Sequence, residues 1–82
     1  MPSTLDLFGK KVKELRIERR ISQEALAAAC AVHRNFIGRV ERGETNITFD
    51  RIMKIAGGLR VRPDELFALI PKPKAPEPHD TE

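Results

Sequence analysis

Two short helix-forming stretches that follow one another closely constrain this chain most. The first runs from Gln23 to Cys30 and is rich in alanine, the residue with the highest helix propensity. Ser22 precedes it as a good N-cap. The second runs from about Arg34 to Arg42, so only a few residues separate the two. A connection this short forces the two helices to pack at an angle around a shared core.

The rest of the sequence predicts three further helices, and therefore an all-α chain of five. The first helix follows Ser3 or Thr4, and its apolar residues recur at spacings of three and four to form one stripe. These apolar residues are Leu5, Phe8, Val12 and Leu15. A fourth helix is expected after the N-cap Thr48, and a fifth opens at Pro63, which suits the first position of a helix. No alternation typical of β-strands is visible.

The last residues differ in composition from the rest of the chain. Prolines stand at positions 71, 73, 76 and 78, and most of the other residues there are charged or polar. We therefore expect one folded unit over residues 4–70, followed by a flexible, disordered tail over residues 71–82. A unit of this size buries only about 60% of the surface that its unfolded chain exposes, so dimerisation would add stability.

Charge and apolar patterning limit the surroundings and partners of the chain. Residues 1–70 carry a net charge of +4 and residues 71–82 a net charge of −1, so the excess of positive charge lies in the first 70 residues. It fits a polyanionic partner such as nucleic acid, but it fits a solvated basic surface equally well.

Cys30 is the one cysteine, so an internal disulfide is excluded, and we expect it to be a small core residue. The longest apolar run, Ala25–Val32, is too short to span a bilayer. The start of the chain does not read as a signal peptide, so we expect a cytoplasmic protein.

Residues suited to catalysis or metal binding are scarce. His33 and His79 are too isolated in the sequence to predict a metal site. The sequence has no Ser/His/Asp grouping, no paired carboxylates and no glycine-rich phosphate loop. We therefore expect neither an enzyme nor a protein that needs a cofactor, a metal or a small-molecule ligand.

Residues 22–42 meet the requirements of a DNA-binding helix-turn-helix. Ala27 is small where the two helices approach, and Ile37 and Val40 can hold the second helix against the first. The outer face of the second helix carries side chains suited to a DNA groove, namely Arg34, Asn35, Gly38, Arg39 and Arg42. The alternative is a helical bundle whose third helix presents a basic face to solvent and binds no partner with it.

The chemistry of two of these side chains matches the edges of bases. Arginine can donate two hydrogen bonds to guanine, and asparagine can pair with adenine. Because the first residues of a recognition helix reach base edges first, we expect Arg34 and Asn35 to contact bases. The helix N-termini after Ser22 and Thr48, and the side chain of Gln23, can meet phosphates.

Residues 10–70 resemble the Cro and phage-repressor (Xre-type) helix-turn-helix family. The matching segments are 15–16, 21–27, 37–43 and 63–67. The resemblance implies a five-helix, lambda-repressor-like DNA-binding domain. Within this family the chain is most similar to the controller proteins of restriction–modification systems. Their recognition helix begins with arginine, a small polar residue and an aromatic residue, as in Arg34-Asn35-Phe36.

The resemblance also implies roles for single residues. It places Arg34, Asn35 and Arg39 in the major groove as base contacts. Contacts to the DNA backbone are expected from Gln23, His33, Phe36, Arg42 and Thr48. Arg16 and Glu41 would form a partly buried ion pair between the first and third helices, or else a weak surface pair.

Three positions depart from the family pattern, and one of them is Arg62, which replaces the usual serine or threonine cap before Pro63. The family often has glycine with a positive φ in the turn, where this chain has Ala31. Either Ala31 bears a strain of roughly 1 kcal/mol or the turn differs locally. The family's aromatic residue is often tyrosine, and Phe36 has no hydroxyl to donate to a phosphate.

The function expected from these observations is that of a homodimeric transcription regulator on double-stranded operator DNA. Two half-sites about one DNA turn apart, roughly 34 Å, would give it specificity. The predicted dimer surface lies on the fourth and fifth helices and comprises Leu59, Val61, Phe67, Leu69 and Ile70. The alternative is an antitoxin or adaptor whose main partner is a protein, such as a toxin or RNA polymerase. The operator, the target genes and the sign of regulation stay open.

Overall fold

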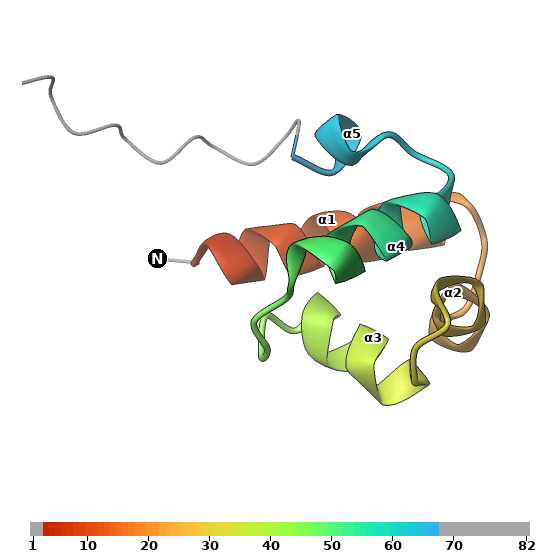
Figure 1. Cartoon of the computed structure of the whole chain (residues 1–82), viewed down its shortest axis with the longest axis horizontal. Coiled ribbons are helices and arrows are strands. Elements are labelled where there is room, and N and C mark those ends of the chain that lie inside the picture. Colours follow the sequence, from red (N-terminus) through yellow and green to blue (C-terminus); the bar gives the residue numbers. More distant parts are fainter. Residues whose placement is uncertain (1–2, 68–82) are drawn as a thin grey trace, which may run out of the picture.

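The computed structural model describes residues 3–67, which form five helices and, within that range, no strand (Figure 1). The helices are α1 (Thr4–Glu18), α2 (Gln23–Cys30), α3 (Arg34–Glu41), α4 (Phe49–Leu59) and α5 (Pro63–Phe67). The all-α prediction is thereby confirmed. The predicted tail, 71–82, lies outside the described residues. No helix in the described range is long and apolar enough to cross a membrane.

Polar side chains at the predicted positions start three of the helices. The hydroxyl of Ser3 accepts a hydrogen bond from the amide of Asp6 at 3.1 Å, and the carboxylate of Asp6 accepts from the amide of Ser3 at 3.0 Å. Ser22 caps α2 by accepting from the amide of Ala25 at 2.9 Å, and Thr48 caps α4. Each cap gives a partner to an amide that the helix itself leaves without one.

The turn between α2 and α3 contains Ala31, where the sequence left open whether the backbone is strained. Ala31 has φ 58° and ψ 42°, the left-handed conformation. The amide of Val32 then donates to the carbonyl of Ala27 at 3.0 Å, which closes the end of α2. Ala31 therefore bears the strain, which costs roughly 1 kcal/mol, and the turn keeps the shape that glycine would give it.

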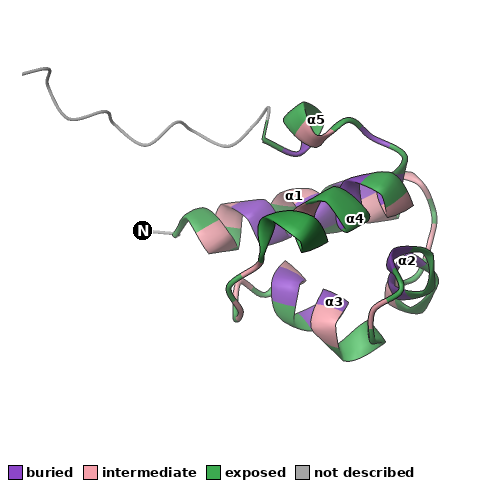
Figure 2. Cartoon of the chain, in the orientation of Figure 1, coloured by how far each residue is buried: buried purple, intermediate pink, exposed green. Residues whose placement is uncertain are grey.

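One apolar core joins all five helices. α1 packs against α3 and α5, and α2 packs against α3 and α4. Figure 2 shows buried residues on all five helices, with exposed residues on α2 and α3 facing away from α4. The side chains with no exposed surface are Val12, Leu26, Ile37, Ile55, Leu59 and Leu66. Each helix supplies at least one of them, so detaching any helix from the core would expose apolar surface to water.

Two residues of the predicted dimer surface lie in this core instead. Leu59 is 0% exposed and Val61 is 8% exposed, because a core this small uses the end of α4 and the following loop to cover its interior. Phe67 is 44% exposed, and Leu69 and Ile70 lie outside the described residues. The dimer prediction therefore has to be corrected at Leu59 and Val61.

Cys30 is a core residue, as expected. Its side chain is buried and donates to the carbonyl of Lys54 at 3.3 Å. Burial raises the pKa of the Cys30 thiol, and the charge of Lys54 opposes this only in part. The thiol therefore stays protonated near neutral pH, as a residue that packs α2 against α4.

Close helix packing makes Gly9 necessary, whereas Gly57 is not constrained. A Cβ atom at Gly9 would overlap the carbonyl oxygens of Val40 and Glu41, where α1 crosses α3. A Cβ atom at Gly57 would meet no atom within 4 Å. The two glycines therefore form a matched pair for testing the packing of α1 on α3.

We predict opposite effects on stability for Gly9→Ala and Gly57→Ala. Gly9→Ala should lower the free energy of unfolding by about 1–3 kcal/mol, because the added methyl group pushes the helices apart. Gly57→Ala should raise it by up to about 1 kcal/mol, because alanine has the higher helix propensity. Urea denaturation followed by circular dichroism measures both. An unchanged urea midpoint for Gly9→Ala would show that α1 and α3 do not approach this closely.

Candidate nucleic-acid interface

The helices α2 and α3 form a helix-turn-helix. Leu26 and Ala27 on α2 and Ile37 and Val40 on α3 are buried in the shared core. His33 is the N-cap of α3, and its Nδ1 accepts a hydrogen bond from the amide of Asn35 at 3.0 Å. A neutral imidazole that accepts at Nδ1 carries its proton on Nε2. Because His33 is exposed, that second nitrogen can still donate to a phosphate.

The exposed face of α3 brings most of the predicted contact residues together. The side chains on this face surround a shallow hollow of about 450 Å³. Its lining residues are Gln23, Arg34, Asn35, Gly38, Arg39 and Arg42. All three predicted base contacts are among them, as are two of the five predicted backbone contacts. This face is therefore strongly basic and rich in hydrogen-bond donors.

A buried ion pair fixes α3 against α1. The Nε atom of Arg16 lies 2.6 Å from Oε2 of Glu41, and the two side chains are 12% and 3% exposed. A second bond joins Arg16 Nη2 to Glu41 Oε1 at 3.2 Å. Arg16 also donates to the carbonyl of Ile21 at 2.9 Å. The partly buried form of the predicted pair is thus the one present in the structure.

Gln23 joins the same cluster. Its Nε2 atom donates to Glu41 Oε1 at 3.0 Å, so the carboxylate accepts from both α1 and α2. The amide group of glutamine has a second N–H, which leaves one donor for a phosphate. The sequence did not predict this bond, which joins side chains on two different helices. The bond holds Gln23, a predicted phosphate contact, at the rim of the hollow.

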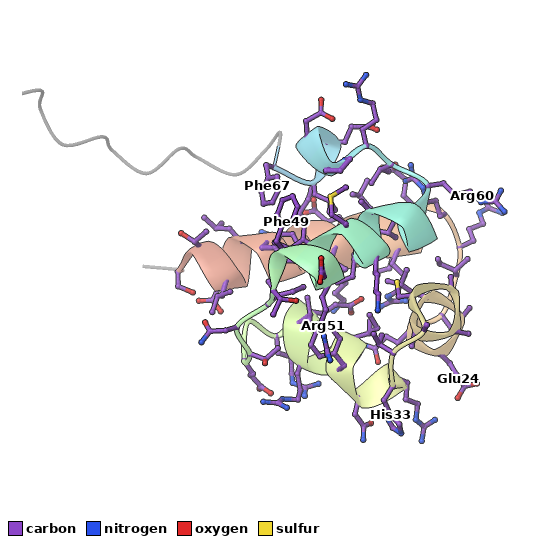
Figure 3. The ribbon with its side chains drawn as sticks, viewed as in Figure 1. Glu24, His33, Phe49, Arg51, Arg60 and Phe67 are labelled. Atoms are coloured by element: carbon purple, nitrogen blue, oxygen red, sulfur yellow. The ribbon has the colours of Figure 1, made fainter. Side chains whose placement is uncertain are left out.

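Arg34 is paired in a way that the sequence did not indicate. Its Nη1 atom lies 3.0 Å from Oε2 of Glu24 on α2, and the side chains are 64% and 74% exposed. Figure 3 shows Glu24 on α2 and His33 at the start of α3 on the side of the molecule away from Phe67. An ion pair this exposed stabilises the protein by under about 1 kcal/mol, so Arg34 can break its pair with Glu24 and bind a base instead.

The remaining predicted backbone contacts, Phe36 and Thr48, lie where α3 meets α4. Phe36 is half-buried at the edge of the core, and the guanidinium carbon of Arg51 lies 4.5 Å from the centre of its ring. Thr48 is exposed, and its hydroxyl accepts from the amide of Arg51 at 3.3 Å. Arg51 is not among the residues that the sequence predicts to contact DNA.

Comparison with known proteins places the chain in a family. The model of a helix-turn-helix family matches residues 12–66, which include all of α2, α3 and α4. The chain belongs to the Xre-type helix-turn-helix family. The predicted resemblance is thereby confirmed, both for the family and for its controller proteins.

Two curated relatives and one solved structure of this helix-turn-helix family describe the similarity. Control protein C.BamHI of Bacillus amyloliquefaciens is 44% identical over 62 residues, which cover 74% of this chain and 76% of the relative. Control protein C.SmaI of Serratia marcescens is 33% identical over 62 residues, covering 76% of this chain and 74% of the relative. The crystal structure of the restriction–modification controller protein C.AhdI from Aeromonas hydrophila matches with a TM-score of 0.76 and 41% identity, covering 77% of this chain and 96% of that one.

The relatives define the class of this helix-turn-helix protein. They are control and controller proteins, so the chain is a DNA-binding transcription regulator and not an enzyme. Within residues 3–67, no three His, Cys, Asp or Glu side chains gather as a metal site would require. The exposed basic face of α3 is therefore the candidate DNA-binding surface.

We predict that the buried ion pair is essential for stability, in contrast to an exposed one. Arg16→Met should lower the free energy of unfolding by about 3–5 kcal/mol, because Glu41 is left charged and buried. The double change Arg16→Met/Glu41→Leu should recover much of that loss. Arg62→Gln removes an exposed ion pair with Asp64 and should cost under about 1 kcal/mol.

Thermal and urea denaturation of these three variants provide the measurement. Equal losses for Arg16→Met and Arg62→Gln would mean that the Arg16–Glu41 pair behaves as a solvent-exposed one.

Proposed function

We propose that the chain is a sequence-specific regulator that binds double-stranded operator DNA by placing α3 in the major groove. The observation that carries this proposal is the single exposed face formed by Arg34, Asn35 and Arg39. Ile37 and Val40, on the opposite side of α3, are 0% and 2% exposed. The helix therefore cannot turn this face inward without losing its place in the core.

The dimensions of α3 suit a DNA groove. Its eight residues make a rod about 12 Å long at about 1.5 Å per residue. The major groove is about 12 Å wide and admits an α-helix. Arg34 and Asn35 are the first two residues of α3, so their side chains reach deepest toward the bases if the helix enters by its N-terminus. Arg39 follows one turn later on the same face.

A homodimer on a pseudopalindromic operator completes the proposal. One α3 helix reads only a few base pairs, and a second copy doubles the site at a spacing of about 34 Å. Three exposed apolar residues on α4 and α5 supply a surface for pairing: Phe49, Met53 and Phe67, which are 73%, 43% and 44% exposed. Figure 3 shows Phe49 and Phe67 on the side of the molecule away from His33. Pairing there would leave α3 free for DNA.

The names of the relatives suggest a biological setting. C.BamHI and C.SmaI are named as control proteins, and C.AhdI as a restriction–modification controller protein. We propose the same role for this chain: control of a restriction–modification system in the cytoplasm, where the DNA lies. The basic α3 surface supports this role.

Selection of bound duplexes from a random pool tests this function directly. Repeated rounds should enrich one sequence with two related halves about one DNA turn apart. Binding that stays weak and indifferent to sequence would refute the proposal. Strong binding of a co-purifying protein, without an enriched duplex, would favour the antitoxin or adaptor alternative.

We predict that two substitutions on the α3 surface separate base reading from backbone binding. Arg34→Ala should reduce affinity for the enriched duplex by about 1–3 kcal/mol and relax the preference at one base position. Gln23→Ala should weaken binding to every duplex alike. Fluorescence anisotropy with the enriched duplex and a shuffled one measures both effects, at fixed salt concentration because affinity depends strongly on salt. If the two variants lose affinity in the same pattern, the division between base and backbone contacts is wrong.

We predict that the exposed apolar surface of α4 controls dimer formation. Phe49→Glu should shift the chain toward monomer and weaken binding to the two-halved duplex, because charge replaces an apolar contact. Ile17→Glu is the matched control, since Ile17 is 55% exposed but lies on α1. Sedimentation equilibrium measures the association. A dimer disrupted by Ile17→Glu and not by Phe49→Glu would move the interface to α1.

A further inference from the structure

An arginine stacked on an aromatic ring occupies the side of α3 that faces α4. The guanidinium carbon of Arg51 lies 4.5 Å from the centre of the Phe36 ring. Figure 3 shows the Arg51 side chain reaching from α4 toward α3. A cation–π contact holds the guanidinium over the ring, while those of its N–H groups that do not face the ring stay free. This arrangement suits binding of an oxygen anion from outside the protein.

Within the described residues Arg51, like Arg39 on α3, has no carboxylate partner, whereas two other arginines near α3 have one. Arg34 is paired with Glu24, and Arg42 with Glu44, at 3.0 Å in each case. Within residues 3–67, no carboxylate lies within 4.0 Å of the Arg51 guanidinium. Its positive charge is exposed and is balanced by no ion pair in that range. A negatively charged ligand would therefore meet it without first displacing a carboxylate.

The position of this stack around α3 indicates which ligand it would meet. Successive residues of an α-helix are about 100° apart, so Asn35 lies at the middle of the exposed arc, with Arg34 about 100° to one side and Phe36 about 100° to the other. Gln23 borders the hollow on the Arg34 side, where it is bonded to Glu41. The Phe36–Arg51 stack borders the opposite side. If the arc faces the floor of a groove, each border faces one sugar–phosphate backbone.

We propose that Arg51 binds a DNA phosphate on the strand opposite to the one that Gln23 contacts, with Phe36 as the platform that orients it. This assignment rests on the proposed function. Phe36 has no hydrogen-bond donor, so on its own it can offer the backbone only apolar contact. Arg51 adds the charge and the donors. Phosphate contacts on both sides of α3 then fix how far the helix rotates in the groove, and so which base edges Arg34 and Asn35 meet.

The local structure allows this role to be tested without unfolding the chain. The amide of Arg51, and not its side chain, donates to the hydroxyl of Thr48 that caps α4. The Arg51 side chain is exposed, and core residues such as Ile55 pack without it. Arg51→Gln therefore removes the charge and keeps the cap. Thermal denaturation should show an unchanged midpoint.

The experiment measures the affinity of the full chain for two duplexes over a range of salt concentrations. The probes are the duplex enriched from a random pool and a shuffled duplex of equal length. Arg51→Gln should weaken binding to both by about tenfold or more for a dimer, as expected when charge-assisted hydrogen bonds are lost. The slope of log affinity against log salt should fall by about 0.9 for each lost phosphate contact, or about 1.8 for a dimer.

Two comparisons separate this contact from a general effect of charge. Lys10→Gln removes the same unit of charge from the exposed surface of α1 and should change affinity less than about twofold. Phe36→Leu should weaken binding in the native chain but have little further effect in the Arg51→Gln chain, because the platform then has nothing to hold. Duplexes that carry a single uncharged methylphosphonate should show one position in each half-site where the native chain loses affinity and Arg51→Gln does not.

The outcomes distinguish this inference from the proposed function. If the native chain prefers the enriched duplex but Arg51→Gln behaves like Lys10→Gln, the phosphate contact is wrong and the proposed function stands. If the native chain binds both duplexes alike, the proposed function itself fails. A loss confined to the enriched duplex at particular base pairs would make Arg51 a base contact and overturn the assignment.

Discussion

The buried carboxylate of Glu41 is the point on which the rest of the structure depends. It accepts hydrogen bonds from Arg16 on α1 and from Gln23 on α2, while it belongs to α3. A charge this buried is tolerated only because both of its oxygens accept hydrogen bonds and a guanidinium lies against it. Hydrogen bonds have preferred directions, which apolar contacts lack, so they fix the rotation of α3 about its own axis. The apolar core alone would hold α3 in place with less control over that rotation.

This control determines what the surface can do. With Glu41 inward, Ile37 and Val40 face the core, and Arg34, Asn35 and Arg39 share the exposed face. The same cluster holds Gln23 at the border of that face, so a stabilising bond and a proposed phosphate contact use one side chain. Stability and DNA binding are therefore not independent at this border. A variant of Gln23 has to be judged by both its unfolding and its affinity.

Much of the fold could be predicted because it depends on local signals. N-caps, apolar spacing and the proline at the start of α5 predicted the helices, and the family resemblance predicted the Arg16–Glu41 pair. Apolar spacing shows which face of a helix turns inward, but not how many apolar residues of that face are buried in the core of a single chain. This is why Leu59 and Val61 were wrongly expected on the dimer surface.

Side-chain partners on neighbouring elements were the part that the sequence could not supply. The bond from Gln23 to Glu41 and the stack of Arg51 on Phe36 join residues on different helices. Such contacts depend on the angle between helices and on the rotamers that this angle permits. Glutamine after an N-cap and arginine in a first turn are both common on plain surfaces, so neither residue type indicated its partner.

The geometry of α4 connects the two proposed surfaces. Phe49 and Arg51 are two residues apart, and side chains at that spacing point about 200° apart around a helix, to nearly opposite sides. Phe49 therefore faces solvent on the proposed dimer surface while Arg51 faces Phe36 and α3. Because α4 is a continuous helix from Phe49 to Leu59, these two surfaces move as one body. The way two copies pair would then set both the distance between their α3 helices and the phosphates that their Arg51 side chains can reach.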